Sequence, residues 1–137
     1  MKTLHIHNNI NQPIHTVYNQ IINNNPPNFI EVCYRTGAIY DECENQIGYL
    51  VSIINLQQID INLYINRANL TLYIFNQGSI TSLFVYTNNI PSSLFPDGLI
   101  DSSIVSTTDK YLGKKGIVYI NSNNITGSRD FTIIFDD

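Results

Sequence analysis

The sequence predicts an α+β fold dominated by strands: an antiparallel sheet of about six to eight strands, barrel- or sandwich-like, with one amphipathic helix near the N-terminus packed against it. Two observations lead to this class. Between residues 48 and 87, four apolar stretches follow one another and are joined by short polar turns. A single stretch near the start has apolar residues at helical spacing. No linker interrupts the 137 residues, so we expect one domain spanning residues 1–137.

The first two predicted elements are a strand and the helix. Leu4 and Ile6 alternate with His5 and His7, as in a half-buried strand. Residues 12–24 follow, and their apolar side chains fall at i, i+3, i+4, i+7 and i+8: Ile14, Val17, Tyr18, Ile21 and Ile22. Two consecutive prolines come soon afterwards and would end such a helix, because a residue before proline avoids the α conformation.

The rest of the chain is predicted to consist mostly of strands. They are expected at residues 30–35, 49–54, 59–65, 70–75, 80–86, 116–121 and 131–135. The stretch 91–109 is less regular. The turns between the four middle strands are short, and short turns join antiparallel neighbours.

The composition excludes several functions. Asn accounts for 19 residues and Ile for 23, whereas Lys and Arg together number 7 and the net charge is −4. Binding to nucleic acid needs a cluster of Lys and Arg, so we expect no nucleic-acid partner. The chain has neither an apolar run of signal-peptide length at its start nor the roughly 20 apolar residues of a membrane span. We therefore expect a soluble protein, either cytoplasmic or released by lysis or non-classical export.

The two cysteines allow two interpretations. If the chain turned in a loop centred on Ala38, Cys33 and Cys43 would face each other and a disulfide could join them. The alternative is two free thiols that behave as small apolar side chains. Neither belongs to a C-x-x-C motif, so a redox centre is not expected.

Two histidines are the candidates for a metal site. His5 and His7 share one face of the first strand, so two imidazoles could reach one metal ion, with a third ligand from His15, Cys33 or Cys43. The alternative is a polar strand face that is exposed or covered by the helix. We favour the alternative and predict no metal and no cofactor.

Six side chains are candidates for a binding surface: Asp41, Glu42, Glu44, Tyr64, Tyr73 and Tyr86. The three acids form a cluster without the spacing of an EF-hand loop. The tyrosines, with their Asn neighbours, could form a stacking and hydrogen-bonding surface for a protein or a glycan. No spacing typical of a catalytic serine, a phosphate-binding loop or a zinc protease is present, so no catalytic residue is predicted.

One stretch resembles a known family. Residues 61–70, INLYINRANL, followed by Phe75 and Gly78, resemble the amino-terminal sheet of ribosome-inactivating N-glycosidase A chains. The resemblance implies an N-glycosidase-like protein or a degenerate relative. In that family an active-site Tyr follows the Asn-Leu pair, whereas here Thr71 does, and the helix with the catalytic Glu and Arg has no counterpart. The composition is similar to that of accessory proteins of clostridial toxin complexes.

The leading functional prediction is a non-catalytic interaction protein. It would bind or co-assemble with another protein through a neutral sheet face or edge, for example as an accessory subunit of a toxin-type complex. Long strands with few charged residues favour pairing with a partner chain. The first alternative is the N-glycosidase-like activity, and the second is a glycan-binding module.

Overall fold

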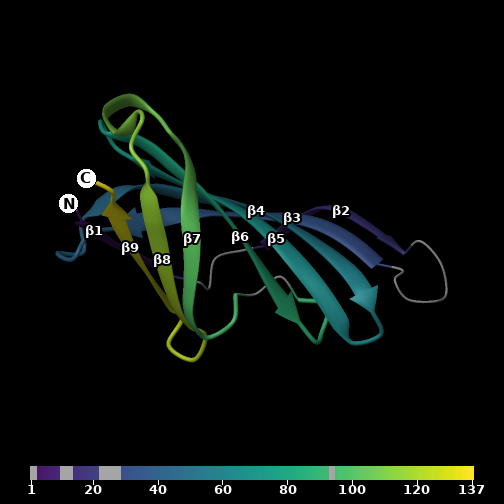
Figure 1. Ribbon diagram of the computed structural model, residues 1–137. Coiled ribbons are helices and arrows are strands. Elements are labelled where there is room, and N and C mark those ends of the chain that lie inside the picture. Colours follow the sequence, from purple (N-terminus) through teal and green to yellow (C-terminus); the bar gives the residue numbers. More distant parts are fainter. Residues whose placement is uncertain (1–2, 10–13, 22–28, 93–94) are drawn as a thin grey trace.

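The chain forms a long, curled antiparallel sheet (Figure 1). The computed structural model describes residues 3–9, 14–21, 29–92 and 95–137, and the side chains of residues 3–8, 31–92 and 95–137. The strands are β1 (Thr3–Asn9), β2 (Ile14–Ile21), β3 (Phe29–Tyr40), β4 (Gln46–Asp60), β5 (Leu63–Ile74), β6 (Gly78–Asn88), β7 (Gly98–Thr107), β8 (Gly116–Asn123) and β9 (Ser128–Phe135). A short 3₁₀ turn, Asp109–Tyr111, follows β7.

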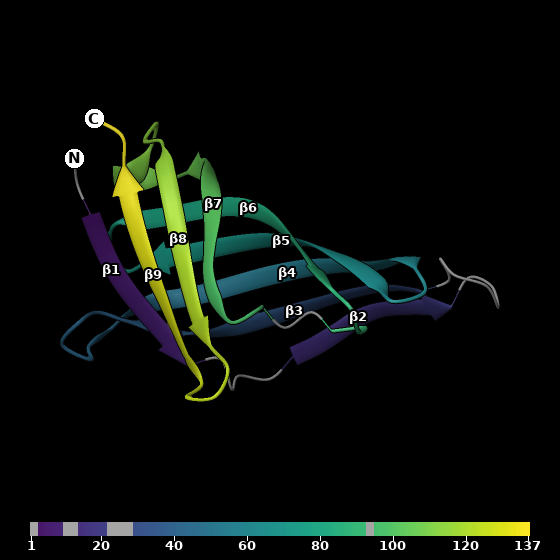
Figure 2. The same cartoon turned by 60° about the horizontal axis from the view of Figure 1, so that its bottom comes forward.

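The sheet closes into an eight-stranded barrel. The strand order is β1-β9-β8-β7-β6-β5-β4-β3-β2, and β1 also pairs with β3 where His7 lies opposite Tyr40. β2 lies along the edge of β3 that also meets β1, and it pairs with the first half of β3, from Phe29 to Arg35. Strands β3 to β6 extend beyond the four shorter barrel strands (Figure 2). One end of the molecule is therefore a closed barrel, and the other is an open sheet of β2 to β6.

Alternation along the strands places one set of side chains inside the barrel. In β4 every second side chain from Gly48 to Gln58 is buried, and the matching positions of β5 and β6 are buried too. The core is mainly aliphatic and aromatic, with Leu50, Leu70, Leu72, Ile120 and Phe131 almost fully enclosed. Cross-strand packing of this kind is the main source of stability in a sheet.

The predicted helix at residues 12–24 is wrong, because residues 14–21 form strand β2. The register of β2 against β3 shifts between Thr16 and Tyr18, which marks a β-bulge. A bulge adds one residue and breaks the period-two pattern. The apolar residues on either side of the bulge then fall at intervals that imitate a helix. The predicted burial of Ile14, Val17, Ile21 and Ile22 concerns side chains outside the described residues.

The α+β class is corrected accordingly: the described residues contain strands and a 3₁₀ turn but no α-helix. The prediction of an antiparallel, β-dominated sheet is confirmed. The stretch 91–109, expected to be irregular, contains the ten-residue strand β7. No helix in the described part of the chain is long and apolar enough to cross a membrane.

Candidate functional site

The most distinctive surface is the outer face of β4, β5 and β6, which we call the neutral face. It consists of nine outward side chains, none of them charged: Tyr49, Val51, Ile53, Asn69, Thr71, Tyr73, Thr81, Leu83 and Val85. The register aligns them in rows across the three strands, so Ile53, Asn69 and Leu83 are direct neighbours. Arg67 borders this surface next to Val85.

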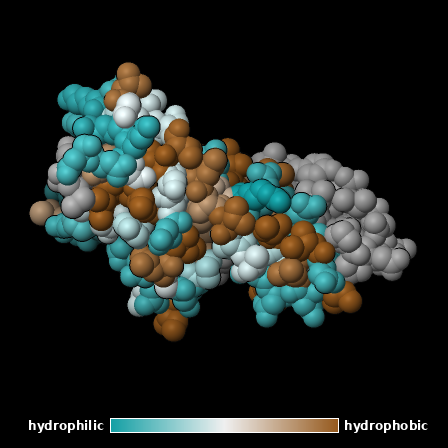
Figure 3. Space-filling model, in the orientation of Figure 1, coloured by the Kyte–Doolittle hydropathy of each residue, from teal (hydrophilic) through white to brown (hydrophobic). Residues whose placement is uncertain are grey.

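The neutral face exposes large apolar side chains. Tyr49 is 51% exposed, Leu83 48% and Val85 57%. Apolar side chains gather over the middle of the molecule, where β5, β6 and β7 run (Figure 3). Scattered apolar side chains are normal on a protein surface, but a contiguous patch of this kind marks an interaction site.

The neutral face contains a groove and a hydrogen bond between two of its side chains. The groove has a volume of about 350 Å³ and lies over β4, β5 and β6, with Arg67 at its border and Asn69, Leu83 and Val85 in its lining. Beside it, the hydroxyl oxygens of Thr71 and Thr81 lie 2.9 Å apart in a hydrogen bond. The surface therefore offers apolar contacts with only a few polar groups to satisfy.

The end of β6 is an open strand edge beside the neutral face. β7 pairs with β6 only from Ile80 to Leu83, whereas β6 continues to Asn88. The hydroxyl of Ser102 in β7 donates to the Leu83 carbonyl at 3.3 Å, so this carbonyl points to the β7 side. Backbone groups alternate along a strand, which directs those of Val85 and Thr87 to the same side. In the described part of the chain, no backbone hydrogen bond reaches these two residues from that side.

The three candidate tyrosines are not brought together in one surface. Tyr73 lies on the neutral face, 45% exposed and directly opposite Tyr49. Tyr64 is half-buried near the start of β5. Tyr86 lies inside the barrel, stacked on Phe84, and burial raises the pKa of its phenol. Only Tyr73 is placed to contact a partner.

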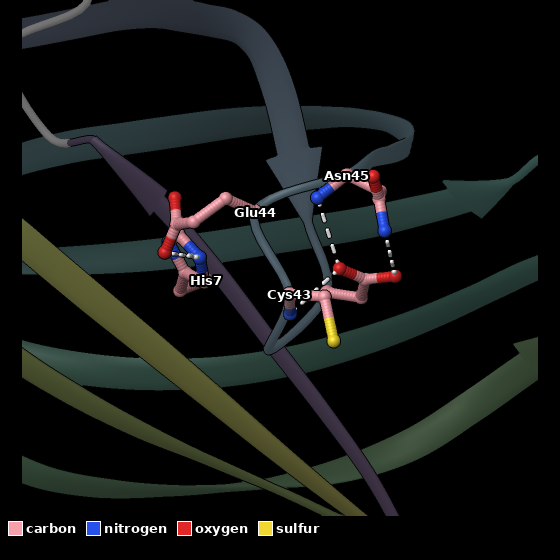
Figure 4. Close-up of polar contacts among 5 residues, drawn as sticks. His7, Cys43, Glu44 and Asn45 are labelled. Carbon is pink, nitrogen blue, oxygen red and sulfur yellow. Dashed lines mark hydrogen bonds and ion pairs between the residues drawn. The ribbon is translucent and has the colours of Figure 1, made fainter.

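His5, His7 and the acidic cluster meet around the outer side of β1. His5, His7 and Glu42 line a groove of about 430 Å³ over β1, β9 and β8. The Nε2 atom of His7 lies 2.9 Å from the Oε1 atom of Glu44 (Figure 4). The His7 ring also stacks on Tyr40. Among the described residues, no group of three or more His, Cys, Asp or Glu side chains is arranged to hold a metal ion.

Asp41 has a structural role in the turn between β3 and β4. Its Oδ1 atom accepts hydrogen bonds from the backbone N–H groups of Cys43 and Asn45, both at 2.9 Å (Figure 4). The hydrogen bond from Asn45 is the main cause that lowers the pKa of the Asp41 carboxyl. This carboxylate therefore caps a turn, a common use of Asp.

The two cysteines lie in different environments. Cys33 is buried inside the barrel opposite Ile54, whereas Cys43 is exposed in the turn, and both are free thiols. β3 continues through Ala38 to Tyr40, so the expected loop at Ala38 is not formed. The arrangement in which the two thiols would face each other is therefore absent.

Sequence reasoning missed two buried arginines. Arg35 of β3 is 4% exposed and Arg129 of β9 is 1% exposed. Burial is the main cause that lowers the pKa of each, and the charge of Arg35 lowers that of Arg129 further, to about 9. Both guanidinium groups therefore remain charged at neutral pH. A signal for Arg129 existed in the sequence, because it shares the inward phase of Phe131 and Ile133 in β9.

Comparison with known proteins identifies the fold and no family. No protein-family model matches the chain, and no curated protein does. Among solved structures, 24 chains match. One of them, a pyocyanin demethylase, covers 98% of this chain and 100% of its own length with a TM-score of 0.64 and 11% sequence identity. At this identity the likeness concerns the arrangement of strands alone.

Proposed function

We propose that this chain is a non-catalytic assembly protein that binds a second copy of itself through the neutral face and the open edge of β6. The observation that carries the proposal is the coincidence of these two features on one side of the molecule. An uncharged apolar surface and an unpaired strand edge are each typical of a protein interface. Here Val85 belongs to both.

Two arguments favour a second copy as the partner. The nine side chains of the neutral face carry no charge, so the faces of two copies can lie side by side when the β6 edges pair, with Arg67 as the neighbouring cation, although each chain carries a net charge of −4. In addition, an antiparallel edge is complementary to itself, because a twofold axis places two such edges in antiparallel register. Pairing of the two β6 edges would give the backbone groups of Val85 and Thr87 their partners.

The test is the oligomeric state of the purified chain, measured by size-exclusion chromatography with light scattering over a wide range of concentrations. We expect a dimer of twice the 15.6 kDa chain mass. Leu83→Lys places a charge in the centre of the neutral face and should weaken the dimer by roughly 100-fold or more, because a twofold interface contains the substitution twice.

Two further variants separate the face from the edge. Val85→Pro keeps an apolar side chain but removes an N–H that points to the open edge, so it should weaken the dimer without breaking the pairing of β6 with β5. Ile125→Lys is the matched control, since Ile125 is 93% exposed in the turn between β8 and β9 and belongs neither to the neutral face nor to β6. A wild-type chain that stays monomeric at high concentration would overturn the proposal, as would equal effects of Leu83→Lys and Ile125→Lys.

The two alternative functions gain no specific support. Thr71, which stands where the N-glycosidase family has its tyrosine, bonds to Thr81 on the neutral face. We therefore expect no depurination of ribosomal RNA by the purified protein. A glycan site would need stacking aromatic side chains around polar groups. Tyr49 and Tyr73 are exposed side by side on the neutral face, but both meet Phe75 edge-on, and none of these three rings lines the groove.

A further inference from the structure

The interior of the barrel contains two positive charges that no carboxylate balances. Arg35 and Arg129 point inward from β3 and β9, and neither forms an ion pair with a described residue. The remaining residues, 1–2, 9–30 and 93–94, include no Asp or Glu that could balance these charges. Taking an unpaired ion out of water costs several kcal/mol, so a buried charge normally has an anionic partner.

The unpartnered atoms of Arg129 have a specific arrangement. Its Nε and Nη2 atoms are buried without a hydrogen-bond partner. These two atoms form one edge of the guanidinium group, and that edge binds an oxyanion through two parallel N–H···O bonds. The face of the group is already used, because the guanidinium carbon lies 4.1 Å from the ring centroid of Phe95. The stacking fixes the plane of the fork and leaves its edge available.

Further polar side chains belong to the same part of the interior. Asn8 and Ser122 are the cross-strand neighbours of Arg129, and the Ser122 hydroxyl is buried without a partner. On the other side, Ser52 lies directly opposite Arg35, and both its hydroxyl and the Nε atom of Arg35 are also buried without a partner. Asn8 links the two strands that carry the arginines, because it lies opposite Arg129 and its side-chain amide donates a hydrogen bond to the Ala38 carbonyl of β3 at 3.1 Å. In agreement with this placement, the charge of Arg35 contributes to the lowered pKa of Arg129.

The geometry points to a binding site inside the barrel for a small oxyanion, such as inorganic phosphate or the phosphate, sulfate or carboxylate group of a small molecule, held by the Nε/Nη2 edge of Arg129 and by Nε of Arg35. The cross-strand partners of Arg35 and Arg129 include two small side chains, Ser52 and Ser122. This inference does not depend on the proposed dimer, because the residues involved point inward and those of the neutral face point outward.

Phe95 is the side chain between this site and solvent. Its ring contacts Arg129 on one side, and it also lines a surface groove of about 160 Å³ together with Asn88, Ser92 and Asn124. We therefore expect a ligand to enter past the Phe95 ring.

The experiment is isothermal titration calorimetry of the full-length chain with sodium phosphate in a chloride buffer, together with thermal unfolding at matched ionic strength. We expect saturable binding at one site and a melting temperature that rises with the phosphate concentration, because a ligand that binds only the folded state stabilises it. Sodium sulfate and sodium acetate in parallel titrations distinguish a tetrahedral oxyanion from a carboxylate.

Three variants assign the effect to the buried arginines. Arg129→Met should raise the melting temperature in chloride, because it removes an unbalanced buried charge, and should abolish phosphate binding. Arg35→Met should raise the dissociation constant by roughly tenfold or more, the loss expected for one charge-assisted hydrogen bond. Arg67→Met, on the outer surface, is the control and should bind phosphate like the wild type.

Two results would overturn the inference. One is the absence of saturable binding of phosphate, sulfate and acetate to the wild-type chain, which would leave the guanidinium groups hydrated by water alone. The other is an equal phosphate-dependent shift in melting temperature for the wild type and Arg129→Met, which is a general salt effect. If Arg129→Met does not fold, the calorimetry of the wild type and of Arg35→Met still decides whether the chain binds an oxyanion at the buried arginines.

Discussion

The guanidinium group of Arg129 lies over the ring of Phe95, 4.1 Å from its centroid, inside the barrel. The same ring meets Phe84 and Tyr86 edge-on, at centroid distances of 5.1 and 5.4 Å. A buried cation is thus held against an aromatic cluster formed by β6 and the segment before β7. Cation–π contacts are worth more when the cation is desolvated, as it is here.

Replacement of Phe95 tests how much this cluster contributes to stability. Phe95→Ala should lower the free energy of unfolding by about 3–5 kcal/mol, because it leaves a cavity beside two rings and removes the support of a buried charge. Urea denaturation monitored by circular dichroism measures the change. Ile125→Ala, at a fully solvated turn position, should change the free energy by less than about 0.5 kcal/mol. Equal midpoints for the two variants would show that Phe95 does not organise the core.

A second prediction concerns the close approach of strands at Gly48. A Cβ atom added there would lie 1.8 Å from the carbonyl oxygen of Tyr73, which is a backbone atom that cannot move aside. Gly48→Ala should therefore cost about 3 kcal/mol or more. Gly113 has a φ of 79° but nothing within 4 Å of its added Cβ, so Gly113→Ala should cost only about 1–2 kcal/mol. Thermal or urea unfolding that ranks the two variants in the opposite order would contradict the close approach of β4 and β5 at Gly48.

The middle strands could be predicted only in part. The strands expected at 49–54, 70–75 and 80–86 lie within or overlap β4, β5 and β6, and their antiparallel order follows the chain. The strand expected at 59–65 is wrong, because the chain turns between Asp60 and Leu63, and residues 55–58 and 66–68 continue β4 and β5 instead of forming turns. The pattern could not tell which face is inside, since β4 contains adjacent apolar pairs such as Leu50 and Val51. From alternation alone, either Leu50 or Val51 could point inward. In the closed barrel Leu50 is buried and Val51 is 39% exposed.

The strand order and the candidate interior site depended on contacts that sequence reasoning cannot supply. The position of the strand at 116–121 in the last hairpin of the chain would suggest an edge at Val118, but β8 lies between β7 and β9, and Val118 is 1% exposed. Within the strand expected at residues 30–35, Arg35 alternates with Val32 and Tyr34, and this pattern favours an outward Arg35. In the barrel the opposite set of side chains points inward, so Arg35 is buried while Tyr34 is only half-buried. Charged residues are so rarely buried unpaired that a pattern argument places them outside.

The accessibility of the two thiols gives a third prediction. Cys43 is exposed in the turn between β3 and β4, and Cys33 is enclosed by the barrel. Titration of the native protein with a thiol reagent should therefore modify one cysteine, and titration in concentrated urea should modify two. Cys43→Ser should remove the reaction of the native protein entirely. Absence of reactive thiols in urea without a reductant would reveal a disulfide between Cys33 and Cys43 instead.

The last prediction is that assembly depends little on salt. The neutral face contains no charged side chain, so association there should gain little from long-range attraction between charges. The dissociation constant of the dimer, measured by analytical ultracentrifugation, should change by less than about threefold between low and physiological ionic strength. Leu83→Glu should weaken the dimer as strongly as Leu83→Lys, because burial of either charge carries a similar cost. A steep fall in affinity with rising salt would instead implicate charged residues, and the acidic cluster of Asp41, Glu42 and Glu44 beside His7 would then be the surface to mutate.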